Sequence, residues 1–503
     1  MGRHRNPILP GCHPDPSICR VGDEFFLVTS TFEYLPGLPV HRSTDLVSWE
    51  LVGHAVDDRF DLSAVPDSGG LFAPTIRHHD GRFFIVCTVV HGDDGARHFV
   101  VTATDPAGPW SDPVWFDGVP GIDPSLTFDG DRVWLCGTRL ASPGLWPGQT
   151  DVWLRELDSA SLVPIGDERL IWRGALDGAV WAEGPHILAR PGGGWMLVAA
   201  EGGTARDHAV CVAYADRIEG PYLGDPGNPR LSHRDLGGFA DIVNVGHADL
   251  VDAPDGSWWA VLLATHVQDG LDSLLGRQTH LVPVVWEDWR PIFAPGVGRV
   301  RHEVEVPGVS DTIGTAREVR DDFSSARLDP QWCGVRRMPQ RFARTGGGWL
   351  HVTAEAASPA FVGRRLLAMH AEVGVDAEVG TAAAAGILLR TSGSAQLEVS
   401  LEAGGEACAT LTAAGRPAEV GRVALGAESA RLRLELDGFS VTAWADGERL
   451  AEIDVSALST TRAGGFLGSW IGPSVHGEGT ARFADFVMRE TASGRVDGAP
   501  VMV

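Results

Sequence analysis

The 503-residue sequence contains no lysine, and all 41 basic residues are arginine. This absence excludes Schiff-base chemistry on a lysine and a lysine-bearing phosphate loop. No apolar stretch approaches the roughly 18 to 20 residues that a membrane span needs. Positive charge is also scarce, because 66 acidic residues outnumber the arginines and give a formal net charge of −25. Nucleic acids and anionic membranes would be repelled, so we expect neither as a partner.

Cysteine is sparse, with seven residues scattered along the chain and no CxxC pair. An odd number in a large chain is typical of reduced thiols, and the missing pair argues against a structural zinc site. The first residues are basic but lead into Pro10-Gly11 instead of an apolar signal-peptide run. We therefore expect a cytoplasmic protein. No GxSxG motif is present, which disfavours a serine hydrolase.

A turn followed by an aromatic-rich apolar strand recurs five times in the first 300 residues. The turn glycines are Gly22, Gly81, Gly130, Gly193 and Gly256, and successive copies lie 49 to 63 residues apart. Asp-Gly before a β-prone run is a hairpin signal, and a repeat of this length with little helical periodicity is typical of propeller blades. The sequence therefore predicts an all-β chain that begins with a five-bladed β-propeller over residues 1–300.

The pattern changes after this repeat. Proline, glycine and charged residues predict a linker over residues 301–320. Beyond it, Arg431-Leu432-Arg433-Leu434-Glu435-Leu436 alternates so that the leucines face a core, and Asp437-Gly438 predicts the hairpin turn. We predict a β-sandwich of the lectin-like jelly-roll type over residues 321–503.

A second repeated element precedes each turn glycine by seven to ten residues. Its copies are His13-Pro14-Asp15-Pro16-Ser17, Ala73-Pro74-Thr75, Ile122-Asp123-Pro124-Ser125, Glu183-Gly184-Pro185-His186 and Gly246-His247-Ala248-Asp249. Each copy would open the innermost strand of a blade. Asp15, Asp123, Glu183 and His247 would then occupy equivalent positions around one end of the propeller axis. We hypothesise that this ring of ionisable groups forms a site.

Asp15, Asp123 and Glu183 are the candidate catalytic residues of that site. A glycosidic bond breaks through an oxocarbenium-like transition state, which needs an acid for the leaving oxygen and a second carboxylate across the sugar. Clustered, partly buried carboxyl groups can keep one member protonated while another stays ionised. Asp-Pro-Ser is also a common turn sequence, so a strand cap is the plain alternative for each acid taken singly.

Several stretches, in the right order over nearly the whole chain, resemble glycoside hydrolase family 43 and its β-xylosidase branch. They are Asn6-Pro7-Ile8 through Ser17, Thr29-Ser30-Thr31-Phe32-Glu33, Ser43-Thr44-Asp45-Leu46, Gly69-Gly70-Leu71-Phe72-Ala73-Pro74, Glu183-Gly184-Pro185-His186, Gly246-His247-Ala248-Asp249, Leu275-Gly276-Arg277 and Phe361-Val362-Gly363-Arg364-Arg365. The resemblance implies an exo-acting, inverting hydrolase that releases terminal xylose from β-1,4-xylo-oligosaccharides. An α-L-arabinofuranosidase, or an enzyme with both activities, is the alternative, and a non-catalytic glycan-binding protein is a more distant one.

The resemblance also implies the roles of the three acids. Asp15 would be the general base that activates water, and Glu183 the general acid. Asp123 would orient Glu183 and tune its pKa. An inverting base and acid are expected to stand roughly 6.5 to 9.5 Å apart, which leaves room for the water.

Four further residues are assigned to substrate binding by the same resemblance. Arg277 would hydrogen-bond the terminal sugar, and Phe32 and Phe72 would line the pocket. His247 would contact water or a Ca²⁺ ion in the propeller axis, and no other cofactor is implied. The plain alternatives are an ion pair for Arg277, a buried structural role for His247 and core packing for the two phenylalanines.

Two features leave the identity of the sugar open. Phe72 stands where relatives usually carry tryptophan, and the stretch from Thr138 to Gly148 is unlike the usual loop. The resemblance further implies an aromatic loop from the second domain at the pocket rim, with Phe466 and Trp470 as candidates. A homo-oligomer is compatible with the resemblance, and the sequence does not decide it.

Overall fold

The computed structural model describes residues 2–92, 95–175, 178–268, 270, 272–314, 316–356 and 358–491. The chain divides into two compact units. The first comprises Met1–Gly270 and Arg277–Ile313, and the second comprises Leu271–Gly276 and Gly314–Val503. No helix among the described residues is long and apolar enough to cross a membrane.

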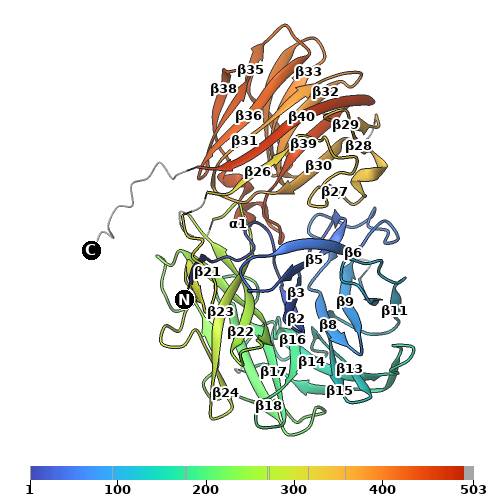
Figure 1. Cartoon of the computed structure of the whole chain (residues 1–503), viewed down its shortest axis with the longest axis vertical. Helices are drawn as coiled ribbons and strands as arrows, with labels where there is room; N and C mark the ends of the chain where they lie inside the picture. Colours follow the sequence, from blue (N-terminus) through green and yellow to red (C-terminus); the bar gives the residue numbers. More distant parts are fainter. Residues whose placement is uncertain are drawn as a thin grey trace. The chain divides into compact units, whose positions relative to one another are not determined.

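Among the described residues, the first unit contains five antiparallel sheets of four or five strands and one small two-stranded sheet. The five larger sheets confirm the predicted five-bladed propeller (Figure 1). Blade one contains β2 (Ser17–Val21), β3 (Glu24–Val28), β5 (Gly37–Ser43) and β6 (Glu50–Val56). Blade two contains β7 (Gly70–Leu71), β8 (Thr75–His79), β9 (Arg82–Val90), β10 (Ala96–Ala103) and β11 (Val114–Phe116). Blade three contains β12 (Ile122–Asp129), β13 (Arg132–Leu140), β14 (Thr150–Leu157) and β15 (Pro164–Trp172).

The last two blades repeat this order. Blade four contains β16 (Glu183–Ala189), β17 (Trp195–Glu201), β18 (Ala209–Ala215), β19 (Leu223–Gly224) and β20 (Leu231–Ser232). Blade five contains β21 (Ile242–Asp252), β22 (Trp258–His266), β23 (Gln278–Glu287) and β24 (Arg290–Phe293). The five predicted turns all join the first two long strands of a blade, as in the β2–β3 and β21–β22 hairpins. The glycine repeat therefore marks the blades correctly.

Apolar side chains fill the interfaces between neighbouring blades. Val198 of β17 packs in one buried cluster with Leu250 and Leu262 of blade five. Ile18 and Leu27 of blade one pack with Val261 of blade five in another cluster, which joins the two ends of the ring. Burial of this surface, at about 25 cal/mol per Å², is the main force that holds the blades together.

One buried carboxylate ties the innermost strands of four blades together. Asp249 of β21 is inaccessible to solvent and accepts two hydrogen bonds from the guanidinium of Arg77 on β8, at 2.7 and 3.2 Å. Strand β2 donates two more hydrogen bonds to Asp249. The Ser17 hydroxyl donates at 2.7 Å and the backbone N–H of Ile18 at 3.1 Å. Arg77 in turn lies 3.2 Å from the Nδ1 atom of His186 on β16. This network holds the innermost strands in place around the axis.

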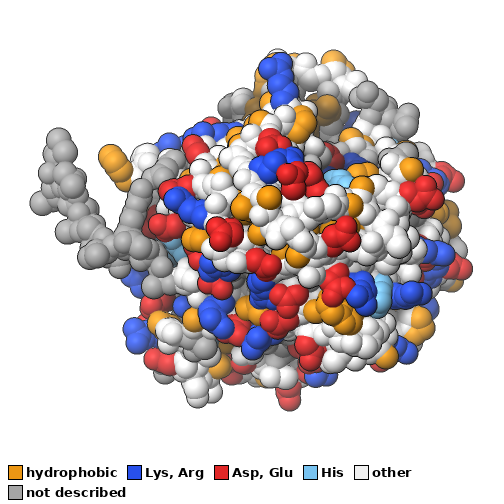
Figure 2. All heavy atoms as spheres, turned by 90° about the horizontal axis from the view of Figure 1, so that it is seen from above, with side chains coloured by type: hydrophobic (Ala, Val, Ile, Leu, Met, Phe, Trp, Pro, Cys, Tyr) orange, Lys and Arg blue, Asp and Glu red, His pale blue; other side chains and the backbone are white. Residues whose placement is uncertain are grey.

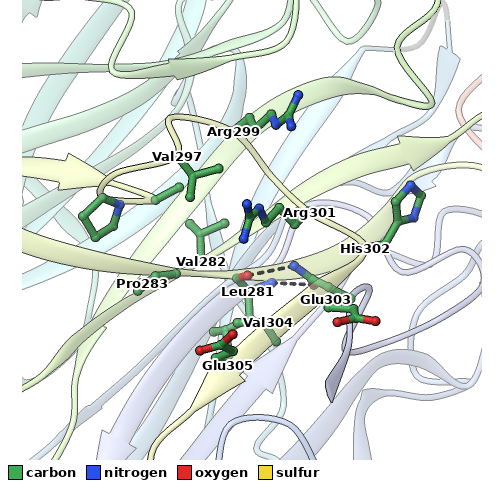
Figure 3. A pocket seen from close by; sticks show the side chains of 13 residues that line it. Leu281, Val282, Pro283, Val297, Arg299, Arg301, His302, Glu303, Val304 and Glu305 are labelled. Carbon is green, nitrogen blue, oxygen red and sulfur yellow. Dashed lines mark hydrogen bonds between the residues drawn. The ribbon is translucent and has the colours of Figure 1, made fainter. Parts of the chain in front are cut away.

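Residues 2–13 close the ring by lying along the last blade. Strand β1 (Gly2–Arg5) pairs with β25 (Glu303–Val306), and the amide side chain of Asn6 makes two hydrogen bonds with the backbone of Leu281 on β23. Figure 3 marks these two bonds at Leu281. Further on, the N–H of His13 donates to the carbonyl of Arg277 at 3.0 Å. Closure thus places the start of blade one directly beside Arg277.

The second unit is a sandwich of two antiparallel sheets. One contains β26 (Glu318–Asp321), β28 (Ala343–Gly346), β29 (Trp349–Ala354), β31 (His370–Glu378), β36 (Ser429–Asp437), β37 (Ser440–Ala445), β38 (Glu448–Asp454) and β40 (Gly479–Glu490). The other contains β27 (Cys333–Val335), β30 (Ala360–Arg365), β32 (Ala384–Ser392), β33 (Ala395–Glu402), β34 (Glu406–Ala413), β35 (Arg416–Ala424) and β39 (Trp470–His476). Leu432, Leu434 and Leu436 are buried in its core, as their alternation predicts.

The segment expected to be a linker contributes strands to both units. Within residues 301–320, β25 pairs with β1 of the propeller, and β26 pairs with β40 of the sandwich. Its alternating Glu303-Val304-Glu305-Val306 pattern buries the two valines, which explains the strand. On the face shown in Figure 2, acidic and arginine side chains are interspersed without a large patch of one sign.

Replacement of Asp249 tests the axial network. Asp249→Ala leaves the Arg77 guanidinium buried without its counter-charge, so we expect the free energy of unfolding to fall by about 3–5 kcal/mol. Asp252→Ala on the same strand is the matched control, because it breaks a half-exposed pair with Arg20 and should cost less than about 1 kcal/mol. Urea unfolding, with hydrogen exchange read on the innermost strands, measures both. Equal losses of unfolding free energy in the two variants would show that the Asp249–Arg77 pair stabilises the fold no more than an exposed ion pair does.

Candidate active site

Asp15 lies two residues before β2 in a pocket of polar partners. It is buried, with 5% of its surface exposed. The Ser30 hydroxyl donates to its Oδ2 atom at 2.6 Å, and the Arg277 guanidinium donates to its Oδ1 atom at 3.0 Å. The Nδ1 atom of His247 lies 3.8 Å from the same Oδ1 atom. Burial by itself raises the pKa of Asp15, but Arg277, His247 and Ser30 together outweigh it, so the pKa lies below its ordinary value.

Glu183 and Asp123 lie equally deep but have few compensating partners. Glu183 begins β16, and Asp123 is the second residue of β12. Burial, followed by the nearby charges of Asp123 and Asp15, raises the pKa of Glu183 well above its ordinary value. Burial also raises the pKa of Asp123 to about 6. The three carboxyl groups therefore interact in one cluster, which favours the ionised form of Asp15 and the protonated form of Glu183.

The pairing register of the innermost strands corrects one prediction about this cluster. The pairing of each innermost strand with the next strand of its blade shows which residues occupy the same place in the five blades. They are Ser17, Thr75, Ser125, His186 and Asp249. Two positions before them stand Asp15, Asp123, Gly184 and His247, all in the left-handed region with φ between 50° and 56°. Glu183 therefore lies one residue ahead of the position that Asp15 and Asp123 share. The prediction that all the acids occupy equivalent positions was wrong for Glu183.

The physical reason for this offset lies in the ring of His247. A Cβ atom on Gly184 would come within 2.7 to 2.9 Å of three imidazole atoms of His247, so no side chain fits there. The backbone N–H of Gly184 instead donates to Oδ2 of Asp123 at 3.1 Å. This bond fixes Asp123 beside the start of β16, next to Glu183.

Imidazole rings gather around the axis near His247. The His186 ring lies 6.3 Å from the His247 ring, and the His208 ring occupies the space where Gly246 would carry a side chain. Burial lowers the pKa of both His186 and His208 to about 3, so both rings are neutral. Ca²⁺ prefers six to eight oxygen ligands. In the described part of the chain, no group of three or more His, Cys, Asp or Glu side chains is arranged to hold a metal ion. A Ca²⁺ ion that His247 contacts through water therefore stays a prediction.

The predicted aromatic residues do meet beside Arg277. The Phe32 and Phe72 rings pack edge to face with centroids 5.2 Å apart, and the Arg277 guanidinium lies 5.8 Å from the centre of the Phe32 ring. Phe32 has a φ of 52° and pairs through its backbone with Leu71. The loops of blades one and two thus deliver an aromatic corner to the guanidinium that bonds Asp15.

Two other regions carry none of the candidate catalytic residues. A hollow of about 470 Å³ lies along β23 and β25, with Arg299 and Arg301 on its lining together with Glu303 and Glu305 (Figure 3). In the second unit, Trp470 is a fully buried residue of β39, and its ring lies under the Arg365 guanidinium at 4.6 Å. Its neighbour Ile471 belongs to the buried core of the sandwich, whereas the place of Trp470 on a pocket rim stays a prediction.

Two family models match this chain. The model described as Glycosyl hydrolases family 43 matches residues 4–290. The chain belongs to glycoside hydrolase family 43. The model described as the beta xylosidase C-terminal concanavalin A-like domain matches residues 320–489.

Individual relatives of this family 43 chain are similar over most of its length. It is 42% identical over 344 residues to a xylosidase/arabinosidase of Butyrivibrio fibrisolvens, an alignment that spans 67% of this chain and 66% of that protein, just under two thirds. It is 38% identical to a non-reducing end alpha-L-arabinofuranosidase of Bacteroides ovatus, over 73% of this chain and 69% of that protein. The solved structure of a xylan beta-1,4-xylosidase from Bacillus halodurans matches with a TM-score of 0.88 at 28% identity, covering 97% of this chain and 100% of that one.

The sequence did not reveal every residue that shapes this family 43 site. Ser30 stands in a stretch that carries the resemblance, yet its bond to Asp15 follows only from the fold. Arg77 follows a plain Ala-Pro-Thr-Ile run and gives no signal of its partner Asp249, which lies 172 residues away. Gly184 is the exception, because a glycine directly after a candidate acid suggests a special backbone conformation.

Substitution of Gly184 tests the contact with His247. Gly184→Ala must adopt a left-handed φ of 56° and place its Cβ against the imidazole, so we expect both a lower melting temperature and a displaced His247. Gly130→Ala is the matched control, since Gly130 has a φ of 57° with no heavy atom within 4 Å of the added Cβ. The backbone cost, about 1–2 kcal/mol, is common to both variants. Thermal unfolding of the two should differ by the steric part alone, and equal melting temperatures would contradict the contact.

Proposed function

We propose that this chain is an exo-acting, inverting glycoside hydrolase that releases terminal xylose from β-1,4-xylo-oligosaccharides. The observation that carries the proposal is the opposite pKa shift of two buried carboxyl groups in one cluster. Asp15 is shifted toward its ionised form, and Glu183 toward its protonated form. A base and an acid that coexist at neutral pH are what single-displacement hydrolysis requires. The names of the Butyrivibrio and Bacillus halodurans relatives support the sugar.

Asp15 is the base of this mechanism. Its ionised carboxylate takes a proton from a water molecule, whose oxygen forms the new bond to the anomeric carbon. Arg277 and Ser30 donate hydrogen bonds to the ionised carboxylate and keep it in that form. The same guanidinium lies 5.8 Å from the centre of the Phe32 ring, and we assign it to binding of the terminal sugar.

Glu183 is the acid. As the bond between the anomeric carbon and the leaving oxygen breaks, Glu183 gives its proton to that oxygen, and the shorter oligosaccharide leaves as a neutral alcohol. Asp123 assists through Glu183, because its negative charge raises the pKa of Glu183 and its bond to Gly184 fixes the start of β16. Proton exchange with solvent then returns Asp15 and Glu183 to their starting states.

A second candidate is α-L-arabinofuranosidase activity, alone or in addition. It is favoured by the Bacteroides ovatus relative, whose name gives that activity, and by the joint name of the Butyrivibrio relative. Terminal xylopyranose and arabinofuranose present similar hydroxyl groups to Arg277. The ratio of kcat/KM for 4-nitrophenyl β-xyloside and 4-nitrophenyl α-arabinofuranoside decides which sugar is preferred.

We also propose a cytoplasmic location for the enzyme. Seven free cysteines, all buried, suit a reducing compartment, so we place the enzyme in the cytoplasm with imported oligosaccharides as its substrates. The net charge of −25 does not disfavour neutral sugars.

Truncation of Glu183 tests the acid. Glu183→Ala should lower kcat/KM for xylobiose by about 10²- to 10⁴-fold, because its sugar leaving group needs a proton. For 2,4-dinitrophenyl β-xyloside, whose leaving group needs none, the loss should be less than about tenfold. Steady-state kinetics measure both, and NMR of the first-formed xylose should show the α anomer in the wild type. Equal losses on the two substrates, or a first-formed β anomer, would contradict the mechanism.

Removal of one hydrogen bond tests the base. Ser30→Ala deletes a donor to ionised Asp15, so the pKa of Asp15 rises and the acidic limb of the kcat/KM profile moves to higher pH, by about one unit. The alkaline limb, where Glu183 loses its proton, should stay in place. Ser63→Ala, an exposed serine that also bonds an aspartate, is the control and should leave both limbs unchanged. An acidic limb that does not move in Ser30→Ala would assign it to another group.

A further inference from the structure

The segment that leads into Glu183 carries a tryptophan in an unfavourable backbone conformation. Trp181 lies two residues before Glu183 and has a φ of 52°, a region that bulky side chains rarely adopt. Such a conformation costs about 1–3 kcal/mol and persists only where the surroundings impose it. Its indole is partly exposed, whereas the next residue, Ala182, is buried in the interface between blades three and four.

Neighbouring loops fasten this segment at both ends. The N–H of Trp181 donates to the carbonyl of Gly148 at 2.8 Å, and the N–H of Gly202 donates to the carbonyl of Val180 at 2.9 Å. Upstream, the buried carboxyl group of Glu201 accepts the N–H of Ala175, and it occupies the space where Gly174 would carry a side chain. The conformation of Trp181 is therefore imposed by the blade-three and blade-four loops.

Glycines border the indole. A Cβ atom on Gly148 would come within 3.5 Å of the indole Nε1 atom, and one on Gly203 within 3.6 Å of its Cδ1 atom. A second tryptophan, Trp146, is tied to the same segment because its Nε1–H donates to the carbonyl of Ala179 at 2.9 Å. Trp181 is thus partly exposed and bordered by glycines just before the start of β16.

We propose that Trp181 is a specificity-determining residue that stacks against the first sugar of the leaving group. The proposal rests on the proposed hydrolase function, in which Glu183 gives its proton to the leaving oxygen. Residues beside the segment that leads into Glu183 therefore lie beside the leaving group. Phe32, Phe72 and Arg277 come from blades one, two and five and gather at Asp15, on the side of the terminal sugar. An indole face suits the apolar face of a neutral sugar ring, and it adds no charge that a neutral chain would have to match.

Substrates with and without a leaving sugar separate this role from a structural one. Trp181→Ala should lower kcat/KM for xylobiose by about tenfold or more, and Trp181→Phe should restore most of it. The kcat/KM for β-xylosyl fluoride, whose leaving group has no ring to stack, should change less than about threefold. Trp289→Ala is the control, because Trp289 is an exposed tryptophan with a positive φ of 61° that lies in the hairpin between β23 and β24. It should change neither substrate. An equal loss on xylobiose and the fluoride would reduce Trp181 to a support for Glu183 and overturn the proposal.

Binding to a variant that cannot turn over its substrate tests the stacking role of Trp181 independently of the hydrolase function. Isothermal titration of xylotriose into Glu183→Gln should show an affinity that falls about tenfold when Trp181→Ala is added. If the wild type hydrolyses no xyloside but this difference is seen, the hydrolase function fails and the stacking role of Trp181 stands. An affinity that does not depend on Trp181 overturns the stacking role, whatever the enzyme hydrolyses.

Discussion

Closure of the propeller ring is the constraint on which the site depends. Residues 2–13 lie along β23, and the hydrogen bond from the N–H of His13 to the carbonyl of Arg277 brings the first and last blades into one register. The hydroxyl of Thr279 donates to the carbonyl of His13 at 2.7 Å and strengthens the same join. Asp15 follows His13 by two residues, so it must meet the guanidinium of Arg277. The ion pair with Arg277, which favours the ionised form of Asp15, thus follows from how the ring closes.

The three acids show how partners, more than depth, decide the state of a buried carboxyl group. Asp15, Asp123 and Glu183 are 5 to 7% exposed, and burial raises the pKa of each. Asp15 alone has a guanidinium and a hydroxyl within hydrogen-bond distance. Asp123 has one backbone N–H, and Glu183 has the negative charges of its two neighbours. An ion pair at Asp15 and neighbouring like charges at Glu183 therefore shift the two pKa values apart within one cluster, as the proposed roles of base and acid require.

The architecture was predictable because each blade repeats the same sequence pattern. Asp-Gly turns at regular spacing located the five hairpins, and alternation in residues 431–436 located a sandwich strand, since both depend on local chemistry. The positions of Asp15 and Asp123 followed from the same repeat. The offset of Glu183 did not, because it depends on a bulge in β16 and on the His247 ring, which comes from a strand about 60 residues further on. Partners such as Arg77 with Asp249 could not be assigned either, since a buried arginine and a surface arginine look the same in sequence.

The identity of the residues with a left-handed backbone conformation around the axis suggests why the site costs the fold little stability. Asp15 and Asp123 stand at such positions, and aspartate tolerates this conformation better than most residues. At the equivalent place on blade four the ring of His247 leaves no room, and glycine takes the position while the acid moves one residue upstream. Phe32 and Trp181 have no such tolerance, so each represents strain that the neighbouring blades must hold. Phe32 is buried beside Arg277, the partner of Asp15, and Trp181 leads into Glu183. The Asp249 network and the apolar blade interfaces supply the rigidity that holds these two conformations in place.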